Sequence, residues 1–201
     1  AGAQEHGVYA YMKHFALNDQ EGNRNCMAAT WSNEQAIREI YLKPFEMSVK
    51  DADCHAVMSS FNYIGNRWAG GCSELLQNVL RGEWGFLGFV ETDYFGVYGY
   101  MTADQAVRNG GDLMLCTTGN DYNNVTVLTN SSKQAMRTSA KNILYTVVNS
   151  RAYEAENLNP GMAKWKIIMI GADVVVALLI VGLEYTAIKN YKKRKEEEEE
   201  V

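Results

Sequence analysis

Residues 56–94 read AVMSSFNYIGNRWAGGCSELLQNVLRGEWGFLGFVETDY, and this stretch indicates the fold class. Two short apolar runs, residues 56–61 and 89–92, are bounded by glycine or polar residues, which is typical of buried strands. Between them, apolar residues recur at helical spacing from Ser73 to a helix stop at Gly85. A strand, a helix and a second strand in this order predict two parallel strands joined by a right-handed crossover.

The same alternation extends to both sides of this unit. Residues 8–13 and 112–116 are predicted strands, and helices are predicted from Ser32, over residues 102–109 and over residues 132–149. The order βαβαβαβα predicts an α/β fold, a partial TIM-type (β/α)8 barrel of about four βα units. A complete barrel usually needs roughly 250 residues, so we expect a fragment or a divergent minimal form.

Two of these helices carry further local signals. Ser32 and Gln35 form a predicted capping box, and Pro44 is expected to disturb the last turns of that helix. The helix over residues 132–149 has an apolar side that is expected to face the core. That side consists of Met136, Ile143, Leu144, Val147 and Val148.

Composition and charge exclude several functional classes. The 201 residues are 47% hydrophobic and 21% charged, which is typical of a globular protein. A formal net charge of -5, without a basic face in the soluble part, argues against nucleic-acid binding, which needs clustered Lys and Arg. Neither the four scattered cysteines nor the three histidines have metal-ligand spacing, so we expect no metal and no other cofactor.

The C-terminal part has a different composition. After Pro160, residues 167–188 are mostly apolar, and 22 residues of helix span about 33 Å, which is enough to cross a bilayer. Asp173 and Glu184 oppose this interpretation, because an acidic group deep in lipid costs about 2.5–3.5 kcal/mol. The alternative is a buried helix of a soluble protein, but the apolar residues surround the helix instead of forming one stripe. We therefore predict a transmembrane helix.

The flanking charges predict its orientation. Five basic residues within 189–195 follow the span, against two just before it, which places the C-terminus in the cytoplasm. The protein would be a single-pass, membrane-anchored protein with an extracellular barrel. Residues 196–200 are expected to form a solvated, disordered tail. Residues 1–14 lack a signal-peptide pattern, so we expect a longer parent protein. The predicted parts are a barrel domain (1–150), a linker (151–166), a transmembrane helix (167–188) and a charged cytoplasmic tail (189–201).

Polar residues end three of the predicted strands, where barrels of this class carry their chemistry. These clusters are Lys13-His14, residues 58–62 and residues 92–94. Taken singly, each is more often structural, since a strand-end Asp commonly caps a loop and a Met is commonly part of the core. Their convergence on one face of the barrel favours a site.

Several stretches resemble the barrel domain of family 3 glycoside hydrolases. The similarity covers about residues 8–149 with matching order and spacing. The matching stretches are residues 13–24, 39–46, 57–62, 74–76, 80–86 and 90–94.

The resemblance implies roles for the strand-end residues. Asp93 matches the catalytic nucleophile, which attacks the anomeric carbon and forms a covalent glycosyl-enzyme. Lys13 and His14 match the pair that hydrogen-bonds sugar hydroxyls, and Met58 matches a residue lining the same subsite. A nearby ammonium such as Lys13 would favour the ionised form that an attacking carboxylate needs.

Other positions complete or depart from the family pattern. Glu21 and Arg24 belong to the matching loop and are expected to support the groups that touch the sugar. Tyr94 stands where many members have Trp, which keeps an aromatic wall of different shape. Phe61 stands where Tyr is usual, so a hydroxyl expected beside the nucleophile is missing.

A retaining glycosidase also needs a second carboxyl as acid and base, about 5–5.5 Å from the nucleophile. Glu91 is expected to be a structural partner deeper in the barrel, and Asp112 to end a loop. The resemblance therefore implies an acid/base on another domain, without which the chain alone is inactive. Because the predicted membrane anchor closes the chain, we expect that domain upstream.

Two functions remain open at this stage. The first is a β-glucosidase-like, exo-acting retaining glycosidase whose partners are a β-linked glycoside or oligosaccharide, the upstream domain and the lipid bilayer. The alternative is a non-catalytic, membrane-anchored sugar-binding or structural remnant of the barrel.

Overall fold

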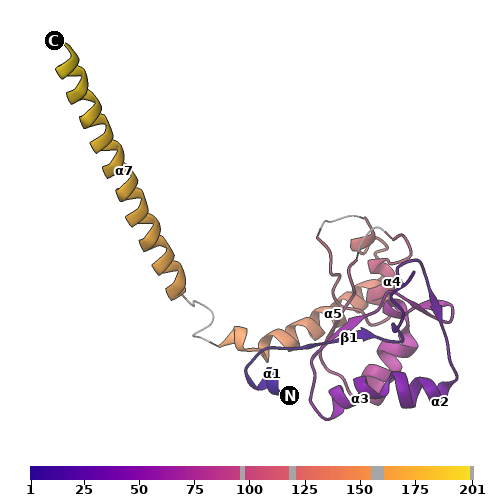
Figure 1. The fold of residues 1–201 in the computed structure, drawn as a ribbon. Helices are drawn as coiled ribbons and strands as arrows, with labels where there is room; N and C mark the ends of the chain where they lie inside the picture. The colour runs from indigo at the N-terminus through magenta and orange to yellow at the C-terminus, as the bar shows by residue number, and fades with distance from the viewer. Residues whose placement is uncertain (96–97, 118–120, 155–160, 200–201) are drawn as a thin grey trace. The chain divides into compact units, whose positions relative to one another are not determined.

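The computed structural model describes residues 1–95, 98–117, 121–154 and 161–199. The chain divides into two compact units, Ala1–Glu154 and Ala155–Val201 (Figure 1). In chain order the first unit contains α1 (Gly2–Glu5), β1 (Tyr11–Phe15), β2 (Ala29–Thr30), α2 (Glu34–Ala36), η1 (Ile37–Tyr41), α3 (Lys43–Lys50), β3 (Ala56–Ser59), β4 (Tyr63–Ile64), β5 (Arg67–Trp68), η2 (Ala69–Gly71), η3 (Glu74–Glu83), β6 (Phe89–Glu91), α4 (Ala103–Arg108), η4 (Asp121–Asn123), α5 (Asn130–Val148) and η5 (Arg151–Tyr153). The predicted α/β class is confirmed.

The central sheet is parallel, with the order β1-β3-β6. Tyr11 of β1 lies opposite Ala56 of β3, which lies opposite Phe89 of β6. The two strands expected within residues 56–94 therefore pair as predicted. The first strand is displaced from its predicted position at residues 8–13, because β1 begins at Tyr11 and continues to Phe15.

One face of this sheet packs on helices. Val57 and Val90 are completely buried in one apolar cluster with Phe15, and η3 contributes Leu76 and Leu80 to it. Because side chains alternate along a strand, the residues next to Val57 and Val90 lie on the opposite face of the sheet. The helical periodicity recognised after Ser73 thus reflects real packing against the sheet.

The fourth predicted strand, residues 112–116, forms only a single parallel bridge between Leu113 and Glu91. Asp112 at its start is buried and forms an ion pair with Arg81, with 2.7 Å between Oδ2 and Nη2. The same oxygen accepts a hydrogen bond from the Val90 backbone N–H at 2.8 Å. Burial raises the pKa of the Asp112 carboxyl, and these donors oppose the shift. Asp112 therefore ties this segment to η3 and β6.

The buried side of α5 is polar, which corrects the expectation from its apolar pattern. Ser139 donates to the Gly111 carbonyl at 3.2 Å, and Asn142 donates to Asp112 Oδ1 at 3.0 Å. Leu144 and Val148, expected in the core, are 60% and 48% exposed. The need of a buried carboxylate and carbonyl for donors decides which side of α5 faces inward.

The helical segment after Ser32 also differs from its prediction. The N-cap is Asn33, whose side chain accepts a hydrogen bond from the Ala36 N–H at 2.8 Å, so the predicted box of Ser32 and Gln35 is wrong. Pro44 lies in the first turn of α3 and does not disturb a last turn. A proline fits there because the first backbone N–H groups of a helix have no intrahelical acceptor.

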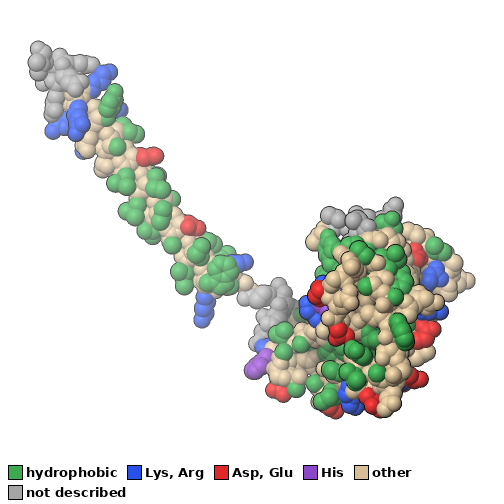
Figure 2. Space-filling model, turned by 45° about the vertical axis from the view of Figure 1, so that its right-hand side comes forward, with side chains coloured by type: hydrophobic (Ala, Val, Ile, Leu, Met, Phe, Trp, Pro, Cys, Tyr) green, Lys and Arg blue, Asp and Glu red, His purple; other side chains and the backbone are tan. Residues whose placement is uncertain are grey.

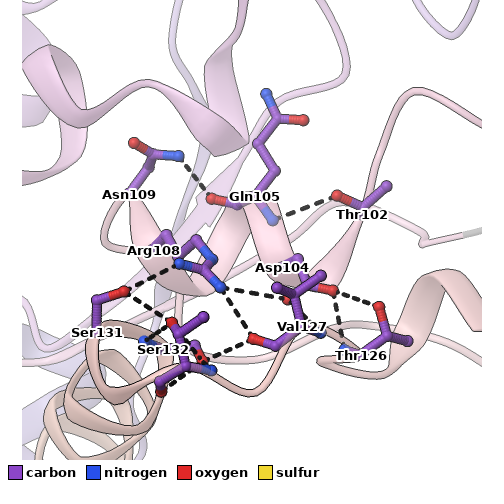
Figure 3. A network of polar contacts seen from close by, with 10 residues as sticks. Thr102, Asp104, Gln105, Arg108, Asn109, Thr126, Val127, Ser131 and Ser132 are labelled. Atoms are coloured by element: carbon purple, nitrogen blue, oxygen red, sulfur yellow. Dashed lines mark hydrogen bonds and ion pairs between the residues drawn. The ribbon is translucent and has the colours of Figure 1, made fainter.

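A polar network joins α4 to the segment that leads into α5 (Figure 3). Asp104 accepts hydrogen bonds from the backbone N–H groups of Thr126 and Val127, at 2.9 and 3.2 Å. Arg108, one turn later, donates to the Val127 carbonyl at 2.9 Å and to Ser131 Oγ at 3.2 Å. These bonds fix the entrance of α5, where Thr129 and Ser132 form a capping box.

The second unit contains the long helix α7 (Lys164–Glu199). Residues Lys164–Lys195 are long and apolar enough to cross a membrane, by length and composition alone. The predicted linker is partly η5, while residues 155–160 lie outside the described residues. α7 continues through Glu199, so that part of the tail expected to be disordered is helical.

Residues 1–160 expressed without α7 should self-associate or remain molten. Within the described ranges the outer edge of β1 has no partner strand, and an open edge next to exposed apolar residues favours pairing with another chain. Size-exclusion chromatography with light scattering, together with urea unfolding, would test this. A monodisperse monomer with cooperative unfolding would contradict it.

Candidate active site

The parallel register brings three strand ends to one edge of the sheet. His14 lies in β1, and Asp93 lies two residues after the end of β6. Between them, the Ser59 carbonyl at the end of β3 accepts a hydrogen bond from the Asp93 N–H at 3.1 Å. The strand-end clusters Lys13-His14 and residues 92–94, which are far apart in the sequence, therefore lie close together.

Asp93 is the centre of this cluster, and it is only 8% exposed. His14 Nε2 lies 3.2 Å and Arg24 Nη1 lies 3.3 Å from Asp93 Oδ2. The other carboxylate oxygen, Oδ1, accepts a hydrogen bond from the Tyr94 N–H at 2.7 Å. Donors to both oxygens compensate the charge of a carboxylate that has lost most of its water and fix the orientation of the group.

Arg24 is held from three sides. Its Nε lies 3.0 Å from Glu21 Oε2, and its guanidinium carbon lies 4.9 Å from the centre of the Phe61 ring. A guanidinium at this distance over an aromatic face gains a cation–π attraction. Phe61, where a tyrosine was expected, thus provides the surface on which the cationic partner of Asp93 rests.

His14 is partly buried, and its protonation is set by competing neighbours. Burial lowers the pKa of His14, and the positive charges of Lys13 and Arg24 lower it further. The Asp93 carboxylate acts in the opposite direction and raises it. A neutral imidazole with its proton on Nε2 donates to Asp93 and leaves Nδ1 as an acceptor.

Three predicted site residues lie at the margin of this cluster. Lys13 is exposed and lines a cavity of about 390 Å³ beside β1, and within the described ranges it forms no ion pair. Lys13 contributes to this cavity, whereas the His14 imidazole contacts Asp93. Met58 is half-buried opposite Glu91 in the strand register. Tyr94 is 41% exposed.

The two other carboxyls considered from the sequence are engaged elsewhere. Glu91 lies beside Tyr11, where burial and this carboxyl together raise the pKa of the Tyr11 hydroxyl to about 12. Burial raises the pKa of Glu91 as well. Asp112 belongs to the buried ion pair with Arg81.

The sequence interpretation assigned no individual role to two residues that position the site, although Asn62 belongs to the strand-end cluster of residues 58–62. The Asn62 side-chain amide donates to the Ala16 carbonyl at 3.1 Å and to Thr30 Oγ1 at 3.0 Å. It thereby joins the loop after β1 to the small sheet β2-β4-β5. The Trp68 indole N–H donates to the Ser60 carbonyl at 2.9 Å. The polar run Ser59-Ser60-Phe61-Asn62 was the available signal, because polar residues right after a buried strand need partners.

The same described ranges hold no group of three or more His, Cys, Asp or Glu residues that would bind a metal ion. The candidate site described above consists of one carboxylate, an imidazole and a guanidinium.

The model of the glycosyl hydrolase family 3 N-terminal domain matches residues 1–144. The chain belongs to glycosyl hydrolase family 3. Probable beta-glucosidase K of Emericella nidulans is 41% identical over 112 residues, which cover 56% of this chain and 13% of that relative. A beta-glucosidase of Rhizobium radiobacter is 42% identical over 112 residues, with the same two coverages.

Solved structures of the family agree with the α/β unit. Beta-glucosidase 3B from Thermotoga neapolitana, in complex with glucose, has a TM-score of 0.65 and 31% identity over 78% of this chain and 23% of that one. A beta-glucosidase from Paenibacillus barengoltzii has a TM-score of 0.66 and 30% identity over 78% and 19%. The chain thus matches only 13% of the length of these two curated relatives.

Asp93→Asn should lower the pKa of His14 further, because it removes the charge that raises it. Arg24→Gln should act in the opposite direction by removing a charge that lowers it. NMR titration of the His14 imidazole in the full chain measures both effects. Asp104→Asn, which alters the network at α4, is the control and should leave the His14 titration unchanged. An unchanged His14 titration in Asp93→Asn would show that the two groups do not interact.

Proposed function

We propose that Asp93 is the nucleophile of a retaining hydrolysis of β-glycosides, carried out by a β-glucosidase-like, exo-acting protein that contains this chain. The observation that carries the proposal is the buried Asp93 carboxylate, with His14 and Arg24 at one oxygen and a backbone N–H at the other. Family membership and relatives named as beta-glucosidases support the reaction class. One structural relative binds glucose, which supports a glucoside-like substrate.

In the first step the carboxylate would attack the anomeric carbon. The bond from that carbon to the leaving oxygen breaks, and an acid protonates the leaving group. In the second step water attacks the same carbon, the bond to Asp93 breaks, and the former acid accepts the proton from water. His14 and Lys13 would bind sugar hydroxyls in both steps, since such bonds help when they strengthen in the transition state.

The remaining residues would shape the subsite. Met58, Phe61 and Tyr94 would line it, and Phe61 also supports Arg24. Glu21 would restrain Arg24 from the loop, although this ion pair is largely exposed and contributes little by itself.

We assign the acid/base to an α/β domain of the parent protein that is not part of this chain. Glu91 and Asp112 are engaged with Tyr11 and Arg81, respectively, which argues against either as the acid. The chain alone would then bind sugar weakly and turn over no substrate.

We also propose that α7 crosses a membrane once, with its basic end in the cytoplasm and the α/β unit outside. The length and apolar composition of α7 and the basic residues within 189–195 support this arrangement.

Asp93→Ala in the complete parent protein should reduce turnover of an aryl β-glucoside by roughly 10⁴-fold or more, because no covalent intermediate can form. Weak sugar binding should persist through Lys13 and His14. Asp19→Asn, at an exposed carboxyl of the loop after β1, is the matched control and should retain activity.

A 2-deoxy-2-fluoro glucoside with a good leaving group traps the intermediate, so peptide mapping should find the label on Asp93. Label on Glu91 or Asp112 would mean that the nucleophile is misassigned. Neither label nor hydrolysis in the intact protein would favour the non-catalytic sugar-binding alternative.

Protease added to intact cells should remove the α/β unit and spare the segment after Lys189, if the proposed orientation holds. Cleavage of the α/β unit only after lysis would reverse the topology. An epitope on each side of α7 distinguishes the two outcomes on one gel.

A further inference from the structure

The long helix α7 carries two acidic residues within its apolar part. Asp173 and Glu184 lie inside or near the end of residues 167–188, and both are exposed. Within the described structure residues 167–188 are all exposed. In Figure 2 the acidic patches of α7 stand out among hydrophobic side chains and lie along one side of the helix.

Their spacing places both carboxyls on one face. Asp173 and Glu184 are eleven residues apart, and at about 100° per residue they differ by only about 20° around the helix. They are separated by about 16.5 Å along the axis. Ala177 lies between them on nearly the same face, where a small side chain lets another helix approach closely. We call Asp173, Ala177 and Glu184 the acidic face.

Contact between the acidic face and lipid hydrocarbon is unfavourable. Ionisable residues in a bilayer are costly, and they generally point toward a partner of opposite charge or a water-filled cavity. Among the described residues, neither Asp173 nor Glu184 forms an ion pair. The acidic face thus lacks the compensation that an acid in hydrocarbon requires.

A second copy of α7 does not provide that compensation. In a parallel pair each acid would meet its own counterpart. In an antiparallel pair centred between the two acids, Asp173 would meet Glu184. Either arrangement brings like charges together, whereas a basic helix neutralises both carboxyls at once.

We propose that the acidic face binds a second transmembrane helix that carries Lys or Arg residues eleven positions apart. The proposal rests on the proposed membrane crossing of α7 and is independent of the chemistry assigned to Asp93. The partner's basic residues would lie opposite Asp173 and Glu184, and the two helix backbones would approach each other at Ala177.

The test uses the full chain, labelled with a donor fluorophore, in phosphatidylcholine vesicles. The probe is an acceptor-labelled Leu/Ala helix of 22 residues with two Lys eleven positions apart. One control peptide has Leu in place of both Lys, and another has the Lys six positions apart, on different faces. Energy transfer should show at least tenfold tighter association with the first peptide than with either control.

Substitutions in α7 identify the face. The double variant Asp173→Asn with Glu184→Gln keeps the shape of both side chains, removes their charge and should abolish the tenfold preference. Val175→Asn adds a polar group on the other side of the helix and should retain it. Equal association of all three peptides, or a preference that survives in the double variant, would overturn the proposal.

Two further measurements distinguish a basic partner helix from a second copy of α7 and from a helix that lies on the membrane surface. Energy transfer between donor- and acceptor-labelled copies of the chain that the double variant abolishes would assign the face to a second copy and overturn the proposal. Oriented circular dichroism measures insertion of α7 independently. A helix lying along the vesicle surface would overturn both this proposal and the membrane crossing, whereas an inserted α7 without the preference would overturn this proposal alone.

Discussion

Parallel pairing of β1, β3 and β6 is the constraint on which the candidate site depends. Each strand supplies part of the site at its carboxyl end, and the register determines which parts meet. The Asp93 N–H bonds to the end of β3, while the Asp93 carboxylate reaches His14 of β1 across that strand. A shift of one residue in β6 would turn Asp93 toward the helices, since alternate residues face opposite sides of a sheet.

Charge compensation then selects the residues around the carboxylate. Phe61 lacks the hydroxyl expected at its position, but its ring supports Arg24 at 4.9 Å from the ring centre. Arg24 in turn reaches Asp93, so an apolar residue acts on the site through the cation that it positions. Arg24 and His14 thus keep the carboxylate paired, and within the described ranges Lys13 forms no ion pair with it.

Sequence patterns predicted the elements whose signals are local. The strands of residues 56–94 and the helix between them were identified because apolar spacing reports directly on packing against a sheet. The buried side of α5 was missed because Asp112 and the Gly111 carbonyl, both distant in sequence, determine it. Asp93 and His14 were found from the sequence because each lies at the end of a predicted strand, which is a local signal. The pairing of Arg24 with Asp93 was missed because it depends on how the loop after β1 folds.

One physical requirement applies to acidic residues in both units of the chain: a carboxylate removed from water needs a cation or several hydrogen-bond donors. Within the α/β unit that need is met by residues of the chain itself: Asp93 has Arg24 and His14, and Asp112 has Arg81. The pairs of Asp93 fix the geometry of the candidate site, and Asp112, which also accepts a hydrogen bond from Asn142, fixes the position of α5. If α7 lies in a bilayer, Asp173 faces the same requirement in a more demanding solvent. Its partner must then come from another helix, and the spacing to Glu184 determines where the cations of that helix lie.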